Sequence, residues 1–133
     1  HVRSRRQRQM CIRDSTSTSP EALKTEQLVD VPLVESVRNY AKLAQAAGLA
    51  GVVCSAHEAA DIASVTGPNF LRVTPGIRPT GSAVGDQSRV ATPGNAASMG
   101  SSAIVVGRPI TKADDPVAAY HAIRDDWNAG RKA

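Results

Sequence analysis

Three short apolar runs, each followed by a helix-forming segment, constrain the fold of this chain most. The runs lie at 50–56, 70–74 and 103–106 and are rich in Val, Ile, Leu and Ala. Compact apolar strands of this kind are typical of a parallel sheet that is covered on both faces. Because each strand is followed by a helix, the crossovers between neighbouring strands are expected to be right-handed. The sequence therefore predicts an α/β protein built on a parallel sheet.

The starts of three helices are marked by a capping residue followed by proline. Ser19, Thr92 and Asp115 can each accept a hydrogen bond from the first turn, and proline suits the first helical position. Glycines at 48 and 67 are expected to end two other helices. The expected helices are 20–28, 34–47, 57–65, 92–99 and 115–127, with a long loop at 75–88 and a shorter one at 108–114.

The length of the chain allows one domain, but it does not allow a closed barrel. The chain has 133 residues, whereas a barrel of eight strand and helix units takes about 250. An open sheet of very apolar strands would expose unpaired edges, which favour aggregation. We therefore expect the chain to be a piece of something larger.

The basic excess of the chain is confined to its first residues. The formal net charge is +4, and residues 1–15 hold five arginines and one aspartate, so residues 16–133 are neutral. Residues 1–15 show no helical or strand periodicity, which predicts a disordered arm. The arm could bind RNA or anionic lipid, but we interpret it as a segment that is not native to the domain at 16–133.

The cysteines and histidines give no sign of a metal site or a catalytic triad. Cys54 lies in an apolar strand, where it is expected to be a small buried side chain. His57 and His121 lie on predicted helices with no partner at a suitable spacing, so we expect both at the surface. We expect no metal and no cofactor. There is no apolar run of about 18 residues and no signal-peptide pattern, which predicts a soluble, cytoplasmic protein.

The loops that follow the second and third strands are the candidate ligand site. Arg78 and Arg108 can each offer a planar fork of donors to a phosphate, Gly107 permits close backbone approach, and Gln87 adds an uncharged donor. In parallel α/β proteins, ligands bind beyond the carboxyl ends of the strands. The alternative is that both arginines form surface ion pairs and the glycine only turns the chain.

Four segments together resemble a known family. GLAGVVCSAHEA, FLRVTPGIRP, GDQSRVATP and IVVGRPITKADDP are similar, in order and spacing, to the carboxy-terminal half of orotidine 5'-phosphate decarboxylase. The resemblance covers about residue 16 to the end. It implies a partial (β/α)8 TIM barrel in which the three strands are the sixth, seventh and eighth.

The resemblance also implies roles for individual residues. The family's phosphate ligands fall, by motif position, on Arg78, Gln87, Gly107 and Arg108. Thr16 corresponds to a residue that touches the pyrimidine, although Ser15 stands where the family has leucine. The family's catalytic Lys and Asp network lies on early strands that this chain lacks, so no catalytic residue is expected here.

The activity implied by the resemblance is decarboxylation of orotidine 5'-monophosphate to uridine 5'-monophosphate in de novo pyrimidine synthesis, without a cofactor. The chain would supply the phosphate-binding half and be inactive alone. Family members are homodimers, so the full-length protein is expected to be one, with a small-molecule substrate and no membrane or nucleic-acid partner.

Two rival functions remain open from the sequence. A related barrel enzyme acting on a sugar phosphate would share the phosphate-binding loops. A non-enzymatic module could instead bind nucleic acid through the arginine-rich arm, although the neutral body argues against it.

Overall fold

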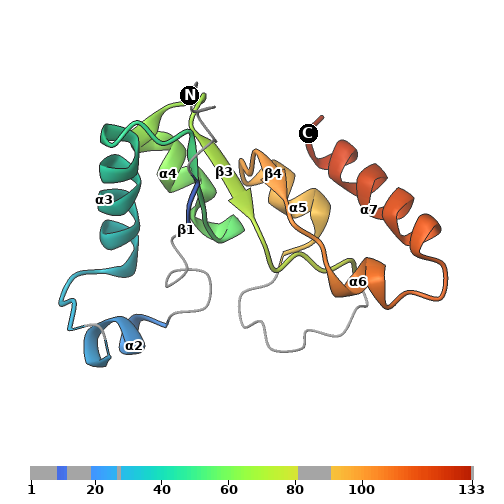
Figure 1. The fold of residues 1–133 in the computed structure, drawn as a ribbon, viewed down its shortest axis with the longest axis horizontal. Helices are drawn as coiled ribbons and strands as arrows, with labels where there is room; N and C mark the ends of the chain where they lie inside the picture. The colour runs from blue at the N-terminus through green and yellow to red at the C-terminus, as the bar shows by residue number, and fades with distance from the viewer. Residues whose placement is uncertain (1–8, 12–18, 27, 81–90, 133) are drawn as a thin grey trace, which may run out of the picture.

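The fold is an open parallel sheet with helices packed against it (Figure 1). The computed structural model describes residues 9–11, 19–26, 28–80 and 91–132. In chain order its elements are β1 (Gln9–Cys11), α2 (Pro20–Thr25), α3 (Leu33–Ala46), β2 (Gly51–Val53), η1 (Ala56–Glu58), α4 (Ala59–Thr66), β3 (Leu71–Thr74), α5 (Pro93–Ser98), β4 (Ala103–Ile104), α6 (Arg108–Thr111) and α7 (Pro116–Gly130).

The four strands lie side by side in chain order, β1-β2-β3-β4, and every pair is parallel. Gly51 pairs with Leu71, and Thr74 pairs with Ile104. A side chain at Gly51 would clash with the Leu71 backbone, so the close approach of β2 and β3 requires glycine there. The predicted parallel sheet is confirmed, although each strand is shorter than its apolar run.

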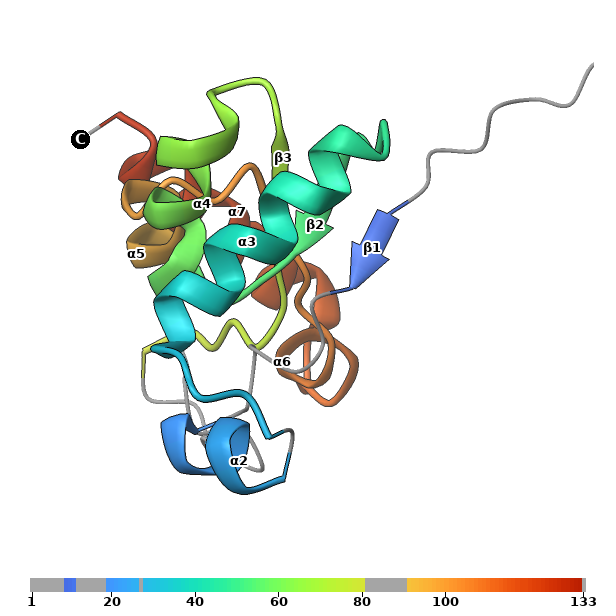
Figure 2. The ribbon, with the colours of Figure 1, turned by 90° about the vertical axis from the view of Figure 1, so that its left-hand side faces the viewer.

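The strand β1 lies within the basic segment 1–15, where the sequence predicted no regular structure. Residues 9–11 pair in parallel with β2, at the edge of the sheet (Figure 2). The edge of β2 presents backbone donors and acceptors that any extended segment can satisfy, so pairing there does not need an apolar pattern. The remaining residues of the segment lie outside the described residues, and its non-native origin stays a prediction.

The helix starts predicted from capping residues are confirmed for α5 and α7. The hydroxyl of Thr92 accepts a hydrogen bond from the backbone N–H of Asn95 at 3.2 Å. A carboxylate oxygen of Asp115 accepts from the N–H groups of Val117 and Ala118, both at 3.0 Å. Each cap satisfies donors that the first turn of a helix leaves unpaired.

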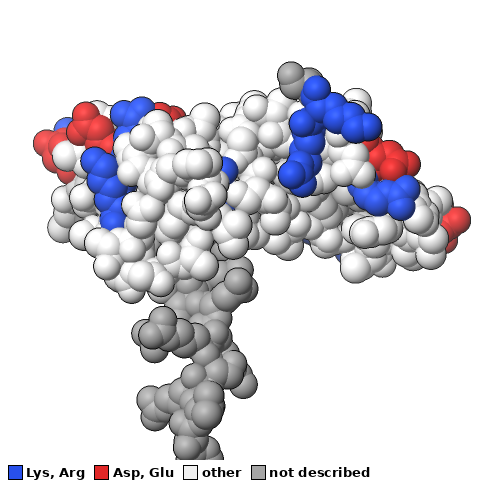
Figure 3. Space-filling model, turned by 90° about the horizontal axis from the view of Figure 1, so that it is seen from above, with Lys and Arg blue, Asp and Glu red and all other residues white. Residues whose placement is uncertain are grey.

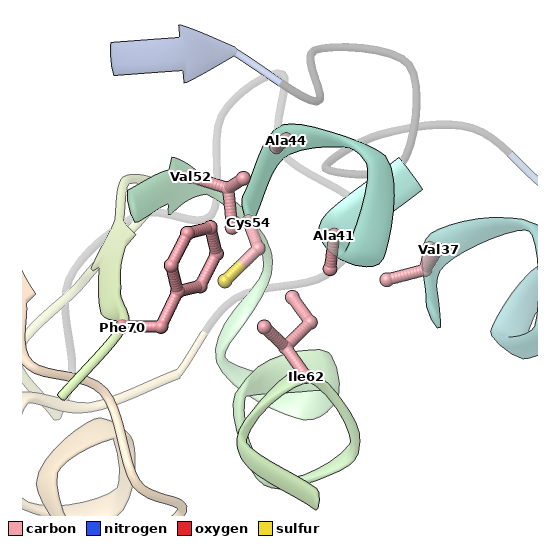
Figure 4. Close-up of a cluster of buried hydrophobic side chains, with 7 residues drawn as sticks. All are labelled: Val37, Ala41, Ala44, Val52, Cys54, Ile62 and Phe70. Atoms are coloured by element: carbon pink, nitrogen blue, oxygen red, sulfur yellow. The ribbon is translucent and has the colours of Figure 1, made fainter. Parts of the chain in front are cut away.

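The larger core lies between β2 and the two helices that cover it, α3 and α4 (Figure 2). Its buried members come from these three elements, from the residue that follows β2 and from the residue that precedes β3: Val37, Ala41, Ala44, Val52, Cys54, Ile62 and Phe70. The Cys54 side chain points into the middle of this cluster, with the Phe70 ring and Ile62 close to it (Figure 4). The prediction that Cys54 is a buried hydrophobe is thereby confirmed.

A smaller core lies under α5 and α7. It combines buried Ala56, Ile77, Ala91 and Ala96 with partly buried side chains that include Trp127. Two glycines set the contact between the helices: a side chain at Gly130 would collide with the backbone of Gly94. The N–H of Gly94 donates to the Asp126 carboxylate at 3.0 Å, which fixes α7 on α5.

Candidate functional site

The candidate site lies at the edge of the sheet where the parallel strands end. Thr74 and Ile104 are paired at the ends of β3 and β4, and Arg78 and Arg108 each follow four positions later along the chain. In Figure 1 the arrowhead of β3 points toward this edge, where α6 also lies. The register therefore carries both arginines to the same edge of the sheet.

The backbone around Arg78 is held by a short parallel bridge. Ile77 pairs with Ala91, and the N–H of Arg78 donates to the Ala91 carbonyl at 3.0 Å. One guanidinium nitrogen donates to the Ile77 carbonyl at 2.9 Å, and the side chain is half-buried. A guanidinium carries five N–H donors, so this bond leaves the side chain capacity for an anion.

Gly107 and Arg108 form the start of α6, and both are exposed. The sequence predicted a loop over 108–114, which is wrong for Arg108–Thr111, because Pro109 fits the first turn of a helix. The φ of Gly107 is −103°, and a side chain there would meet nothing within 4 Å. Because no described atom fills that position, this glycine borders space that a ligand could use.

Two other predicted site residues, Thr16 and Gln87, lie outside the described residues. The candidate site therefore rests on Arg78, Gly107 and Arg108. Gln87 lies in the sequence between Ile77 and Ala91, and these two residues pair in a parallel bridge.

The lysine and histidine side chains that the structure describes all lie at the surface. All four lysines of the chain are exposed: Lys24, Lys42, Lys112 and Lys132. His57 and His121 are exposed, as predicted. In the part of the chain that the structure describes, no group of three or more His, Cys, Asp or Glu side chains could hold a metal ion. No helix in that part is long and apolar enough to span a membrane.

Cys54 is unsuited to nucleophilic chemistry. The pKa of its thiol is raised from 9.0 to about 12, first by burial and then by the nearby Glu58 carboxylate, whereas Arg72 and a hydrogen bond with Thr74 act to lower it. Since the thiolate is the reactive form, this side chain is inert near neutral pH.

Sequence reasoning missed Arg72, which lies in β3 and is only 8% exposed. Its guanidinium donates to the carbonyls of Gly100 at 2.8 Å, Phe70 at 2.6 Å and Gly67 at 3.4 Å. Arg72 thus ties the end of α4 to the turn after α5. The available signal was its position between two apolar residues of a strand, where a charge must find internal partners.

Comparison with known proteins decides the family. The family model described as "Orotidine 5'-phosphate decarboxylase / HUMPS family" matches residues 4–123. The chain belongs to this family. The match begins inside the basic segment 1–15.

The similar relatives are about twice as long as this chain. An orotidine 5'-phosphate decarboxylase of Cutibacterium acnes is 94% identical over 126 residues, which are 95% of this chain and 53% of the relative. One from Streptococcus uberis is 56% identical over 120 residues, which are 90% of this chain and 52% of that protein. The chain therefore spans about half the length of the curated relatives that it matches.

Solved structures support the same fold. The crystal structure of orotidine 5'-phosphate decarboxylase from Lactobacillus acidophilus matches with a TM-score of 0.70 and 47% identity, over 84% of this chain and 45% of that one. The protein of the same name from Pyrococcus horikoshii, at 20% identity, has a TM-score of 0.63 over 90% of this chain and 50% of that chain, and it supports the fold alone. The four parallel strands and their helices are thus a partial (β/α)8 barrel, as the sequence predicted.

Proposed function

We propose that this chain supplies the phosphate-binding half of an enzyme that decarboxylates orotidine 5'-monophosphate to uridine 5'-monophosphate. The observation that carries the proposal is the placement of Arg78 and Arg108 beyond the paired ends of β3 and β4, in a chain of this family. The open space beside Gly107 supports it further, because a phosphate could approach the backbone there.

The proposed role of these residues is binding rather than bond breaking. A hydrogen bond to a charged group contributes about 1.5 to 3 kcal/mol, so two arginines and nearby N–H groups could hold a phosphomonoester. Binding energy gained on a remote phosphate can be used to position the reacting part of a substrate. The lysine and carboxylate groups that the chemistry needs are proposed to lie in the part of the family's fold that this chain does not match.

The proposal is tested by calorimetric titration of the purified chain with uridine 5'-monophosphate. Arg78→Gln and Arg108→Gln should each weaken binding about tenfold or more, because each removes a charged donor. Arg131→Gln is the matched control, since Arg131 is exposed beyond the end of α7, and it should change binding less than about twofold.

Three results would contradict the proposal. The first is an equal effect of all three substitutions. The second is preference for ribulose 5-phosphate over uridine 5'-monophosphate, which would favour a sugar-phosphate enzyme. The third is formation of uridine 5'-monophosphate by the purified chain alone, because the catalytic groups would then lie within it.

The location and assembly of the full-length protein are part of the same proposal. A cytoplasmic homodimer would fit a biosynthetic enzyme of this family, and light scattering on the full-length protein would test the dimer.

A further inference from the structure

Two buried hydroxyl groups meet at the end of β3, close in sequence to Arg78. Thr74, the last residue of β3, is 1% exposed, and Ser101, in the segment that joins α5 to β4, is 9% exposed. Their side-chain oxygens lie 2.7 Å apart, which is a hydrogen bond. A buried hydroxyl that loses its partner is costly, so this pair favours one position of the strand end.

The segment that holds Ser101 is itself fixed on both sides. The N–H of Ser101 donates to the Ala96 carbonyl at 3.1 Å, and the N–H of Ser102 donates to the Arg72 carbonyl at 2.8 Å. The hydroxyl of Ser101 is therefore presented from a rigid support. Through it, the side chain of Thr74 is tied to both α5 and the start of β4.

The backbone between Thr74 and Arg78 has little freedom to absorb a displacement. The ring of Pro75 fixes its φ angle, and Gly76 has a φ of +76°, in the left-handed region that favours glycine. Ile77 is fully buried and forms a bridge with a distant segment. A shift of Thr74 is therefore passed on to Arg78.

The direction of the Arg78 side chain depends on this backbone. One guanidinium nitrogen donates to the carbonyl of the preceding residue, Ile77, at 2.9 Å, so the guanidinium moves with the turn. Hydrogen bonds weaken steeply as their angles depart from linear, and arginine binds phosphate through a planar fork of donors. A small rotation of the turn should thus weaken phosphate binding even though the charge is unchanged.

We propose that the hydroxyl pair of Thr74 and Ser101 positions Arg78 for the phosphate, without either residue touching the ligand. Arg108 should depend on the pair much less, because it lies in a different element, α6. The inference deepens the proposed function and rests on it in taking a phosphate as the ligand of Arg78.

Calorimetric titration of the purified chain with uridine 5'-monophosphate tests the role of the hydroxyl. Thr74→Val keeps the shape of the side chain but removes the hydroxyl, and it should weaken binding about fivefold. Thr74→Ser keeps a hydroxyl and should stay within about twofold of the parent chain. Ser101→Ala removes the other member of the pair and should act as Thr74→Val does, which keeps the test open if Thr74→Val does not fold.

Thr66→Val is the matched control. The hydroxyl of Thr66 donates to the Ile62 carbonyl at 2.7 Å, at the end of α4 and shortly before β3 begins. The control thus loses a hydroxyl bond at the opposite edge of the sheet. It should change binding less than about twofold. Equal weakening by Thr66→Val and Thr74→Val would mean that the pair only stabilises the fold, and would overturn the proposal.

A double-mutant cycle identifies the arginine through which the pair acts. In a chain that carries Arg78→Gln, adding Thr74→Val should weaken binding less than about twofold further, because the positioned charge is already gone. In a chain that carries Arg108→Gln, the same addition should keep its effect of about fivefold. Equal further losses in both backgrounds would overturn the assignment to Arg78.

Hydrogen exchange gives a readout that needs no nucleotide. The N–H of Arg78 donates to the Ala91 carbonyl at 3.0 Å, and the N–H of Leu49, at the end of α3, donates to the Ala44 carbonyl at 3.1 Å. Thr74→Val should speed exchange at Arg78 about fivefold relative to Leu49, because local opening is easier when the strand end is loose. Thr66→Val should leave this ratio unchanged.

The two proposals can fail separately. If the parent chain does not bind uridine 5'-monophosphate but Thr74→Val speeds exchange at Arg78, the proposed function fails and the positioning of Arg78 by the hydroxyl pair is supported. If the parent chain binds the nucleotide and Thr74→Val changes neither exchange nor binding, the positioning role is overturned and the proposed function remains.

Discussion

Two regions of the sheet differ in how completely their apolar side chains are removed from water. In the β2 region, formed by β2, α3 and α4, seven side chains form one buried cluster. In the β4 region, formed by β4, α6 and α7, the helix α7 buries only Ile123, and α6 buries none. β2 lies between two strands and beneath two helices, so its apolar side chains are buried by elements of this chain. β4 lies at the edge of the sheet, so the apolar side chains beside it stay exposed unless another layer covers them.

Charged side chains gather at both ends of one face of the molecule. The face at the amino-terminal ends of the strands, seen in Figure 3, carries acidic and basic side chains near its two ends, with an uncharged stretch between them. Among the described ion pairs, Arg38 of α3 binds Asp61 of α4, and Arg124 of α7 binds its neighbour Asp125. One of these ion pairs thus joins two helices within the β2 region, and the other lies within a single helix.

The largest effect should come from truncating the same side chain in each region. Ile62→Ala should lower the free energy of unfolding by about 2 to 5 kcal/mol, because Ile62 is fully buried and a cavity would remain. Ile110→Ala should cost about 1 kcal/mol or less, because Ile110 is only half-buried beside an apolar groove between β4, α6 and α7. Urea unfolding of both variants measures the difference, and equal losses would contradict the contrast between the regions.

The second effect concerns Arg72, which ties the end of α4 to the turn after α5 through backbone carbonyls. Arg72→Met should lower stability by about 1 to 3 kcal/mol, because buried carbonyl groups would lose their donor. Arg38→Met is the control, since its ion pair with Asp61 is partly exposed and such pairs contribute about 0 to 1 kcal/mol. Urea unfolding measures both variants. If Arg72→Met lowered the free energy of unfolding less than Arg38→Met, the hydrogen bonds from Arg72 to these carbonyls would not be an important source of stability.

The third effect is a pH dependence confined to the β2 region. The pKa of Cys54 is about 12 in the folded chain against 9.0 without burial, so the unfolded chain loses this proton first as the pH rises. Stability from the neutral thiol is therefore complete below pH 9 and falls between about pH 9 and 12, with about 1.4 kcal/mol lost by about pH 10. Cys54→Ala should remove this part of the alkaline slope. An unchanged slope in unfolding measured at several pH values would rule out the buried thiol as its source.

The smallest effect should come from the cap of α7 in the β4 region. Asp115→Ala removes the acceptor for two N–H groups and should cost about 1 kcal/mol. Asp115→Asn, which keeps an acceptor, should retain most of the stability. Thermal unfolding separates the two variants, and identical losses would mean that charge rather than capping stabilises this end.

The sequence predicted most of what local chemistry determines. Strand positions followed from compact apolar runs, and the starts of α5 and α7 followed from caps at Thr92 and Asp115, because these signals act over a few residues. The pairing of β1 and the role of Arg72 depend on groups that are distant in the chain, so no local pattern revealed them. For the candidate site, the arginines were found as strand-end residues, but their common edge depends on the register of Thr74 with Ile104.

The contact between Gly94 and Gly130 has a consequence for how this family can vary. These two positions act as a spacer of fixed thickness between α5 and α7, since any side chain at 130 would push the helices apart. Such a shift would also move Trp127 and Tyr120, which share α7 with Gly130. Substitutions at 94 and 130 are therefore expected to arise together, or to be accompanied by substitutions around Trp127 and Tyr120. A change at the contact between α5 and α7 would then affect side chains up to about three turns away on α7.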